Sequence, residues 1–269
     1  MSLRPHAWAP PPVLILAAGR GRRLSGTDGP ASGIPKILLP FGGRTLLQRH
    51  LERLAQAGAG PVHLVVGYQA HLIEAELERL GRRDSVTLIH NPDWHEGSIV
   101  SLDAGRAVVE NGGPVVLMDA DVLYGQAMIE RLFGSTHPAV LLLDREIEPG
   151  DEPVRICVDA DGRIVDFAKQ PDAPHLWYGE SVGFFRFSAD IAASLALRVH
   201  ATVSGGGRMI EYEEPIRALI RDDASRAGAS ASPMFGFEDV SGLPWTEIDF
   251  MEDVVKAEAL LPLLDGGAA

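Results

Sequence analysis

The sequence contains one cysteine and has fewer basic than acidic residues. The lone thiol, Cys157, excludes an intramolecular disulfide and a cysteine-based zinc site, and we expect it to be an inert buried residue. With 24 Lys and Arg against 37 Asp and Glu, the formal net charge is −13. Because a phosphate backbone recruits clusters of Lys and Arg, this charge argues against a nucleic-acid partner. A polyanionic ligand would need a local group of basic residues or metal ions.

Long hydrophobic runs are missing as well. No stretch reaches the roughly 18 to 20 continuous apolar residues of a membrane span, and residues 1–12 lack the apolar core of a signal peptide. We therefore expect a cytoplasmic protein with no membrane partner. The nine histidines form no ligand-spaced motif. Hydrophobic residues nevertheless make up 46% of the 269 residues, which is ample for the core of one large domain.

The N-terminal half alternates short apolar runs with helical patterns. Strands are predicted at residues 13–16, 62–66, 86–89, 114–118 and 139–143, and helices at 45–57, 69–81, 98–111 and 125–132. This alternation predicts an α/β fold in which a Rossmann-like, mostly parallel sheet is flanked by helices. In such sheets ligands gather at the carboxyl ends of the strands.

The C-terminal half has a different pattern. Two short strands at 155–158 and 164–167 flank a turn at 159–163, and a further strand is predicted at 181–187. Helices are predicted at 188–198, 211–221 and 249–264, with a loop at 224–232. We therefore expect a smaller part built of β-hairpins and helices that follows the parallel sheet.

The most informative motif follows the first predicted strand. Val13–Leu16 runs into Ala17-Ala18-Gly19-Arg20-Gly21-Arg22-Arg23-Leu24, and Pro35-Lys36 comes shortly afterwards. Small residues let backbone N–H groups approach phosphate oxygens, while the arginines and the lysine supply positive charge. A P-loop would need G-x-x-x-x-G-K-[ST], which is absent, and a dinucleotide fingerprint would need a third glycine at Leu24. The motif therefore suits a triphosphate.

Two acidic clusters are candidates for a metal site. The strand predicted at 114–118 leads into Asp119-Ala120-Asp121, and the period-two spacing lets both carboxylates project near the strand end. Mg²⁺ prefers carboxylate and phosphate oxygens, so this position beside a triphosphate loop suits it, although a solvated turn is the alternative. Asp249, followed by Glu252 and Asp253, fits either a metal site or a helix N-cap. The residues alone leave that choice open.

Three motifs resemble one enzyme superfamily. The string L-A-A-G-R-G-R-R-L…P-K, which ends at Lys36, resembles the signature L-A-A-G-x-G-T-R-L…P-K of the nucleoside-triphosphate transferases, with Arg22 in place of the usual Thr or Ser. N-P…G-S-I-x-S-L at 91–102 and W-x-E-I-D at 245–249 are similar to segments of bacterial choline-phosphate and phosphonate cytidylyltransferases. The first of these two also resembles molybdopterin cytidylyltransferases, whose strand usually ends in D-Q-P rather than D-A-D. The resemblance extends over nearly the whole chain.

This resemblance implies one nucleotidyltransferase domain over residues 1–269, with a lead-in at 1–12, a nucleotide-binding core at 13–150 and an acceptor-binding part at 151–265. The implied reaction is Mg²⁺-dependent transfer of CMP from CTP to a small phosphorylated or phosphonylated acceptor, with release of pyrophosphate. Phosphocholine and 2-aminoethylphosphonate are the favoured acceptors. The alternatives are a sugar-1-phosphate nucleotidylyltransferase, a molybdopterin cytidylyltransferase and a non-catalytic nucleotide-binding module. A homodimer is left open.

The resemblance also implies roles for individual residues. Asp121 and Asp249 match the metal ligands, and the expected catalytic cations are Arg23, Lys36 and Lys169. Lys169 lies in F-A-K-Q-P, where the superfamily has V-E-K-P and uses the lysine to grip the acceptor phosphate. The residues expected at the nucleotide are Leu16, Ala17, Ala18, Gly19, Arg20, Gly21, Asn91, Ser98 and Ser101. Those expected at the acceptor are Lys169, Tyr178, Glu180, Glu214, Trp245 and Glu247.

Simpler explanations compete with several of these roles. Ser98 could cap a helix, the aromatic residues could belong to the core, and the glutamates could lie on solvated helix faces. Taken together, however, aromatic rings and carboxylates suit an ammonium group through cation–π contacts and charge pairing. An amine-bearing acceptor is therefore favoured over a carboxylated or hydroxylated phosphonate.

Overall fold

The computed structural model describes residues 10–21, 24, 33–147, 150–226 and 232–266. Arg22 and Arg23, most of the expected lead-in and part of the expected loop at 224–232 lie outside these residues. The first elements are β1 (Val13–Ala17), the 3-10 helix η1 (Lys36–Leu38), β2 (Pro40–Phe41), β3 (Arg44–Thr45), α2 (Leu46–Gln56), β4 (Val62–Val66), α3 (Ala70–Arg79), η2 (Arg83–Ser85), β5 (Val86–His90), α4 (Ser98–Ala104), α5 (Arg106–Val109) and β6 (Val115–Asp119). They are followed by β7 (Val122–Tyr124), α6 (Gln126–Gly134), β8 (Ala139–Asp144), β9 (Arg155–Val158), β10 (Ile164–Ala168), β11 (Trp177–Phe187), α7 (Ala189–Ser204), α8 (Glu213–Arg226), β12 (Phe235–Asp239), β13 (Trp245–Glu247) and α9 (Met251–Asp265).

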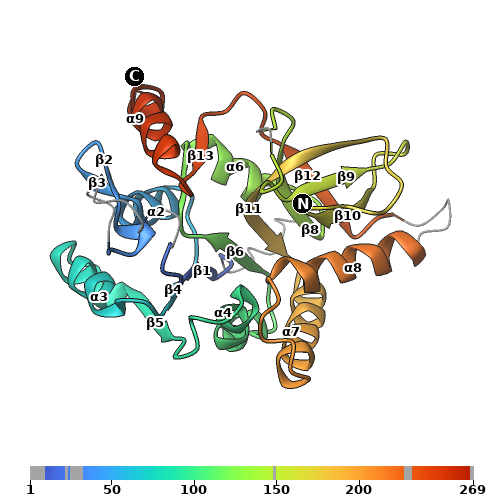
Figure 1. Cartoon of the computed structure of the whole chain (residues 1–269), viewed down its shortest axis with the longest axis horizontal. Helices are drawn as coiled ribbons and strands as arrows, with labels where there is room; N and C mark the ends of the chain where they lie inside the picture. The colour runs from blue at the N-terminus through green and yellow to red at the C-terminus, as the bar shows by residue number, and fades with distance from the viewer. Residues whose placement is uncertain (1–9, 22–23, 25–32, 148–149, 227–231, 267–269) are drawn as a thin grey trace, which may run out of the picture.

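Four parallel strands, in the order β5-β4-β1-β6, form one side of the main sheet, with β5 at its edge (Figure 1). All five strands predicted in the N-terminal half are present. The fifth, β8, is separated from β6 by the antiparallel β11 and pairs in parallel with β12. The prediction of a Rossmann-like, mostly parallel sheet is therefore confirmed.

Helices cover both faces of this sheet. On one face, Val13 and Ile15 of β1 belong to a core that includes residues of α2, α3, α6 and α9. On the other face, Leu14 of β1 and Leu117 of β6 pack with residues of α4, α5, α7 and α8. This division follows from the pleat, which points successive side chains to opposite faces. Among the residues that the structure describes, no helix combines the length and apolar character needed to cross a membrane.

The strand β11 joins the parallel sheet to the C-terminal hairpin. Its residues 184–187 pair with β6, whereas residues 177–180 pair with β9. The strands β9 and β10 form the predicted hairpin, with a hydrogen bond of 3.0 Å from Asp159 N to Arg163 O across its turn. Because its first residues continue the sheet onto β9, β11 begins at Trp177 rather than at the predicted residue 181.

The helix predicted over 98–111 is divided into α4 and α5 at Gly105. A Cβ at Gly105 would lie 2.6 Å from Cδ2 of Leu14, so the glycine lets this segment approach β1 closely. Gly105 is therefore a packing requirement that the apolar periodicity does not reveal.

A small antiparallel sheet of β7 and β13 connects the C-terminal region to the end of β6. Trp245 pairs with Tyr124, and Glu247 pairs with Val122. Just beyond the sheet, Ile248 N donates to the carbonyl oxygen of Asp121 at 2.9 Å. Residues near position 248 are thereby brought beside residue 121, where the site lies.

Candidate active site

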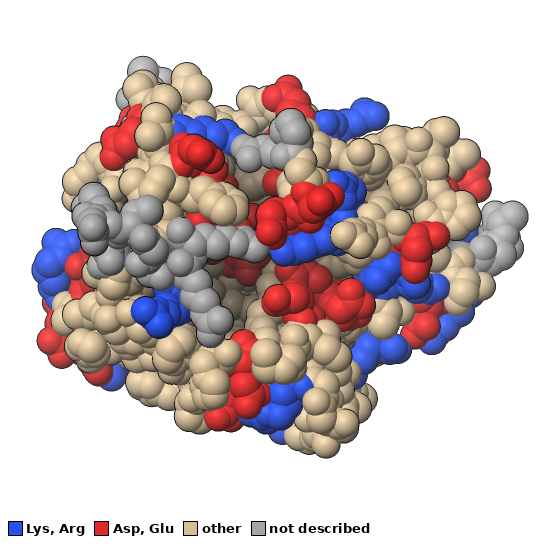
Figure 2. Space-filling model, in the orientation of Figure 1, with Lys and Arg blue, Asp and Glu red and all other residues tan. Residues whose placement is uncertain are grey.

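The carboxyl ends of β1 and β6 open into a cavity of about 510 Å³, the β1 cavity. A second cavity of about 600 Å³, the α9 cavity, lies among residues of β11, β13 and α9. Figure 2 shows acidic side chains gathered around the hollow at the centre of this face. The two cavities share the lining residues Asp119, Lys169, Tyr212, Glu213, Glu247 and Asp249.

The loop after β1 forms one wall of the β1 cavity, which residues 16–21 line as far as the described chain continues. Gly21 has a φ of +63°, and a Cβ there would lie 2.9 Å from Cγ of Lys36, so both conformation and space require glycine. The guanidinium carbon of Arg20 lies 5.6 Å from the ring centroid of Tyr68. The loop therefore presents small residues and one described arginine to the cavity, as a phosphate chain would require. Arg23 lies outside the described residues.

The segment between β5 and α4 forms another part of the cavity wall. Ser98 and Ser101 line the β1 cavity, and the buried Asn91 donates from Nδ2 to Ser101 Oγ at 3.0 Å. Ser98 Oγ donates to Glu211 Oε2 at 2.5 Å and accepts from Tyr212 N at 2.8 Å. Ser98 thus connects the start of α4 to the residues before α8, which differs from the simple N-cap considered above.

Lys36 lies between two aspartates. Its Nζ is 2.8 Å from Oδ2 of Asp121 and also contacts Oδ1 of Asp249. Burial opposes the charge of the lysine, but the two carboxylates outweigh it and raise the pKa of Lys36 above its usual value. The structure therefore brings together three residues that the sequence had assigned separately to phosphate and metal.

The β7–β13 pairing explains why Asp249 reaches Asp121. Asp249 follows directly on β13 and Ile248, whose backbone is bonded to Asp121. The cap of α9 comes from Asp253, whose Oδ2 accepts from the backbone N of Asp249 at 2.9 Å and of Phe250 at 2.7 Å. The Asp249 carboxylate is consequently directed to Lys36 instead of to the helix end.

Three carboxylates form a donor set that fits a divalent cation. One oxygen each of Asp121, Glu247 and Asp249 lies within 4.8 Å of the others. The Glu247 side chain is exposed to the cavity. The surrounding protein nevertheless limits its solvation, and this effect, together with the charges of Asp121 and Asp249, raises the pKa of Glu247 to about 8. Carboxylate oxygens clustered in this way are the ligands that Mg²⁺ takes in proteins, so the residues present fit the metal.

Asp119 has a different partner from Asp121. Its Oδ2 accepts a hydrogen bond of 2.7 Å from the hydroxyl of Tyr212. Gly183, with a φ of +77°, faces the same carboxylate, and a Cβ there would collide with it. Burial, together with the charges of Asp121 and Glu213, raises the pKa of Asp119 well above its usual value. The two aspartates at this strand end therefore have separate roles.

Lys169 lines both cavities from the end of β10. Its Nζ lies 3.0 Å from Oε2 of Glu152, and its carbonyl oxygen accepts from Arg155. Across the site, burial raises the pKa of Glu213 to about 7, and the charge of Lys169 partly offsets that effect. The lysine is thus the positive group that faces both cavities from the hairpin side.

The far wall of the α9 cavity contains two buried carboxylates and an indole. Glu180 and Asp144 are partners on adjacent strands, and both line the cavity. Burial and the charge of Asp144 raise the pKa of Glu180 to about 7. Trp245 Nε1 donates to Asp144 Oδ2 at 2.6 Å, which fixes the indole beside these acids. Asp144 was missed in the sequence, although it follows an apolar run as Asp119 does.

Two residues expected at the acceptor lie outside the linings of both cavities. Tyr178 is 42% exposed and has the guanidinium carbon of Arg155 5.6 Å from its ring centroid. Glu214 lies 3.5 Å from Nη1 of Arg217 on the surface of α8. The preceding residue, Glu213, lines the cavities instead, because successive helical residues point about 100° apart. The run E-Y-E-E at 211–214 indicated that acidic residues of this segment could lie at the acceptor. Which of its glutamates faces the cavities depends on the rotational phase of α8, which the run does not reveal.

Comparison with known proteins places this arrangement in a family. The MobA-like NTP transferase domain matches residues 13–171, which is more than half of the chain. The CMP-5'-(3-aminopropyl)phosphonate synthase of Streptomyces rubellomurinus is 34% identical over 159 residues, covering 58% of this chain and 24% of that protein. The chain spans between 24% and 51% of the length of the first curated relatives that it matches.

Solved structures have the same fold. The inositol-1-phosphate CTP transferase from T. maritima superposes with a TM-score of 0.72 at 20% identity, covering 97% of this chain and 99% of that one. The CTP:phosphocholine cytidylyltransferase from Streptococcus pneumoniae superposes with a TM-score of 0.68 at 19% identity, covering 93% and 98%. The resemblance to nucleoside-triphosphate transferases is thereby confirmed. By its sequence match and its fold, the chain belongs to the MobA-like NTP transferase domain family.

Proposed function

We propose that the protein is a divalent-metal-dependent cytidylyltransferase that transfers CMP from CTP to a small amine-bearing phosphonate or phosphate. The observation that carries the proposal is the carboxylate set of Asp121, Glu247 and Asp249 beside the small-residue loop at 16–21. Family membership supports nucleotidyl transfer in general. The names of both solved relatives include CTP, and the name of the phosphonate synthase includes CMP, which supports a cytidine nucleotide as the donor.

The β1 cavity would hold the triphosphate. A cation bound by Asp121, Glu247 and Asp249 would neutralise part of its charge. Lys36 contacts two of these carboxylates, so its ammonium is within reach of the same phosphates. Arg20 and Lys36 would bind the phosphate oxygens and stabilise the charge that develops on the leaving pyrophosphate.

Lys169 would bind and orient the acceptor. An ionised oxygen of the acceptor's phosphonate or phosphate would form a bond to the α-phosphorus of CTP. The bond from the α-phosphorus to the oxygen that bridges it to the β-phosphorus would break. The electron pair leaves with pyrophosphate, so the step needs neither a protein nucleophile nor a proton transfer. The contribution of the protein is then alignment and charge neutralisation, which is consistent with a lysine that faces both cavities.

The α9 cavity supports an amine-bearing acceptor. Glu180 and Asp144 offer negative charge and Trp245 offers an aromatic face in one wall. The name of the Streptomyces relative contains an aminoalkylphosphonate, which is an acceptor of the same chemical class. We therefore favour 2-aminoethylphosphonate or phosphocholine over sugar 1-phosphates, because an ammonium adds charge pairing and a cation–π contact that neutral hydroxyls lack.

The direct test is a coupled pyrophosphate-release assay with four nucleoside triphosphates and a panel of acceptors. We expect turnover with CTP plus 2-aminoethylphosphonate or phosphocholine, and loss of turnover in EDTA. Turnover only with another triphosphate and a sugar 1-phosphate would replace the proposal with a sugar nucleotidylyltransferase. Nucleotide binding without turnover of any acceptor would indicate a non-catalytic module.

A further inference from the structure

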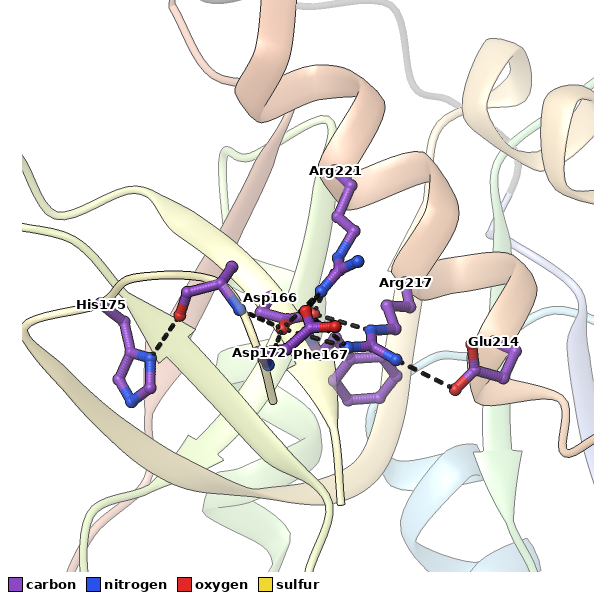
Figure 3. Close-up of polar contacts among 8 residues, drawn as sticks. Asp166, Phe167, Asp172, His175, Glu214, Arg217 and Arg221 are labelled. Atoms are coloured by element: carbon purple, nitrogen blue, oxygen red, sulfur yellow. Dashed lines mark hydrogen bonds and ion pairs between the residues drawn. The ribbon is translucent and has the colours of Figure 1, made fainter. Parts of the chain in front are cut away.

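Asp166 is a fully buried aspartate in β10, and its carboxylate is the centre of a polar network (Figure 3). Two arginines of α8 donate to it: Arg217 Nε lies 2.8 Å from Oδ1, and Arg221 Nη2 lies 2.9 Å from Oδ2. Burial opposes ionisation, but these arginines and the backbone donors outweigh it and hold the pKa of Asp166 well below its usual range. The residue is therefore a permanently charged group inside the protein.

The backbone donors come from the segment that contains Lys169. Phe167 N donates to Oδ1 at 2.9 Å, while Asp172 N and Ala173 N donate to Oδ2 at 3.0 Å and 3.1 Å. Both ends of the segment between residues 167 and 173 are thus tied to one carboxylate. Lys169 lies between these ties, so Asp166 fixes the backbone from which the lysine side chain extends.

The arginine donors come from α8, which packs directly against β10. Arg217 and Arg221 are one turn apart and share a face of α8. At the start of the same helix, Glu213 lines both cavities. It directly follows Tyr212, whose hydroxyl donates to Asp119. One buried carboxylate therefore joins the loop that carries Lys169 to the helix that carries Glu213.

We propose that Asp166 is a positioning residue, which fixes the distance between Lys169 and the start of α8 and thereby sets the affinity for the acceptor. This inference rests on the proposed function, in which Lys169 binds the acceptor's phosphonate or phosphate. A lysine side chain is flexible, but its reach is measured from its backbone. The location of the Lys169 backbone therefore limits where its ammonium can act.

Stability alone does not explain a charge at this position. Buried ion pairs commonly add little stability over well-packed apolar residues of similar volume. A carboxylate instead adds direction, because it aims N–H groups from a loop and from a helix at a single point. A reaction between two bound substrates requires binding groups that are held in fixed relative positions, and this carboxylate holds the loop and the helix in that way.

The test compares Asp166→Asn with a matched control in the full-length protein. Asp166→Asn keeps the shape and one acceptor oxygen but removes the charge. Asp172→Asn removes a 72% exposed carboxylate from the same two arginines and leaves Asp166 in place. Val199→Ala, in the buried core of α7, serves as a control for general loss of stability.

Two measurements are made on each variant: amide hydrogen exchange of the free protein, and kinetics with CTP and 2-aminoethylphosphonate. In Asp166→Asn we expect exchange at Asp172 and Ala173 to accelerate by about tenfold or more. We also expect the acceptor KM to rise by about ten- to a hundredfold, while the Kd for CTP changes by less than about twofold. Neither control should change the acceptor KM in this way.

Unchanged exchange at residues 172–173 in Asp166→Asn would overturn the inference. A parallel rise of the acceptor KM and the CTP Kd in Asp166→Asn would also overturn it. The case would be strongest if Val199→Ala showed the same rise in both constants at an equal loss of thermal stability. If the wild-type protein transferred CMP to no acceptor, the proposed function would fail. The exchange measurement would then still decide whether Asp166 fixes the Lys169 segment.

Discussion

The ammonium nitrogen of Lys36 lies 2.8 Å from Oδ2 of Asp121. Asp121 is also one of three carboxylates whose geometry fits a divalent cation. Lys36 therefore neutralises the same carboxylates that would hold the metal, and its ammonium competes electrostatically with a cation at this position.

Replacing Lys36 should accordingly strengthen the binding of a metal alone. In Lys36→Met we expect the Kd for Mn²⁺ without nucleotide to fall by about tenfold or more, because a positive charge in direct contact with two ligands is removed. Use of CTP should weaken at the same time. Titration calorimetry measures the first effect, and steady-state kinetics measures the second.

The control for this experiment is Lys169→Met. Lys169 lines the same β1 cavity but pairs with Glu152, not with Asp121 or Asp249. Equal gains in Mn²⁺ affinity in both variants would show that only overall charge matters, and the specific competition by Lys36 would be excluded.

Asp121→Asn and Asp249→Asn should each lower the rate of transfer by about a thousandfold or more, because each removes an anionic ligand of the proposed metal. The folded state should persist, since both carboxylates are partly exposed at 21%. Asp161→Asn, in the exposed turn of the β9–β10 hairpin, makes the same chemical change away from the site. A near-normal rate in Asp249→Asn, or wild-type turnover in EDTA, would contradict the metal assignment.

Glu180 should make stability depend on pH. Its pKa is raised from 4.5 to about 7, mainly by burial, so the folded protein binds this proton more tightly than the unfolded chain does. The stability from this group is fully present below the unfolded pKa and is lost as the pH rises through about 7. Glu180→Gln, which resembles the neutral form, should therefore be more stable than the wild type at pH 8, on the order of 2 kcal/mol, and equal to it near pH 4.5.

Thermal unfolding at the two pH values measures this difference. Glu258→Gln, on an exposed position of α9, is the matched control and should show no pH-dependent gain. A stability gain in Glu180→Gln that is the same at both pH values would show that packing, and not titration, is responsible.

The acceptor head group should be selected by charge. If Glu180, Asp144 and Trp245 enclose an ammonium, contacts worth about 0.5 to 2 kcal/mol each should favour an amine over a neutral isostere by about tenfold to a thousandfold. The measurement compares kcat/KM for 2-aminoethylphosphonate with that for 2-hydroxyethylphosphonate at fixed CTP. Glu180→Gln should reduce this preference selectively. Equal use of both acceptors would remove the ammonium site while leaving cytidylyl transfer intact.

The sequence by itself determined five strands of the main sheet and the phosphate-side motif. The strands β1, β4, β5, β6 and β8 were predictable because apolar residues and strand length are local properties of the chain. The loop at 16–21 was predictable for the same reason, since its small residues and Arg20 are consecutive. Asp121 was recognisable from its place after an apolar run.

Only the tertiary structure decided which of the remaining residues meet. Asp249 lies beside Asp121 because β13 pairs with β7, and short strands of this kind carry a weak periodic signal. Glu213 faces the cavities and Glu214 does not because the phase of α8 is fixed by its packing on the sheet. The ties from Asp166 to Arg217 and Arg221 likewise join residues far apart in the chain. Such pairings depend on long-range packing, which the local pattern of residues does not encode.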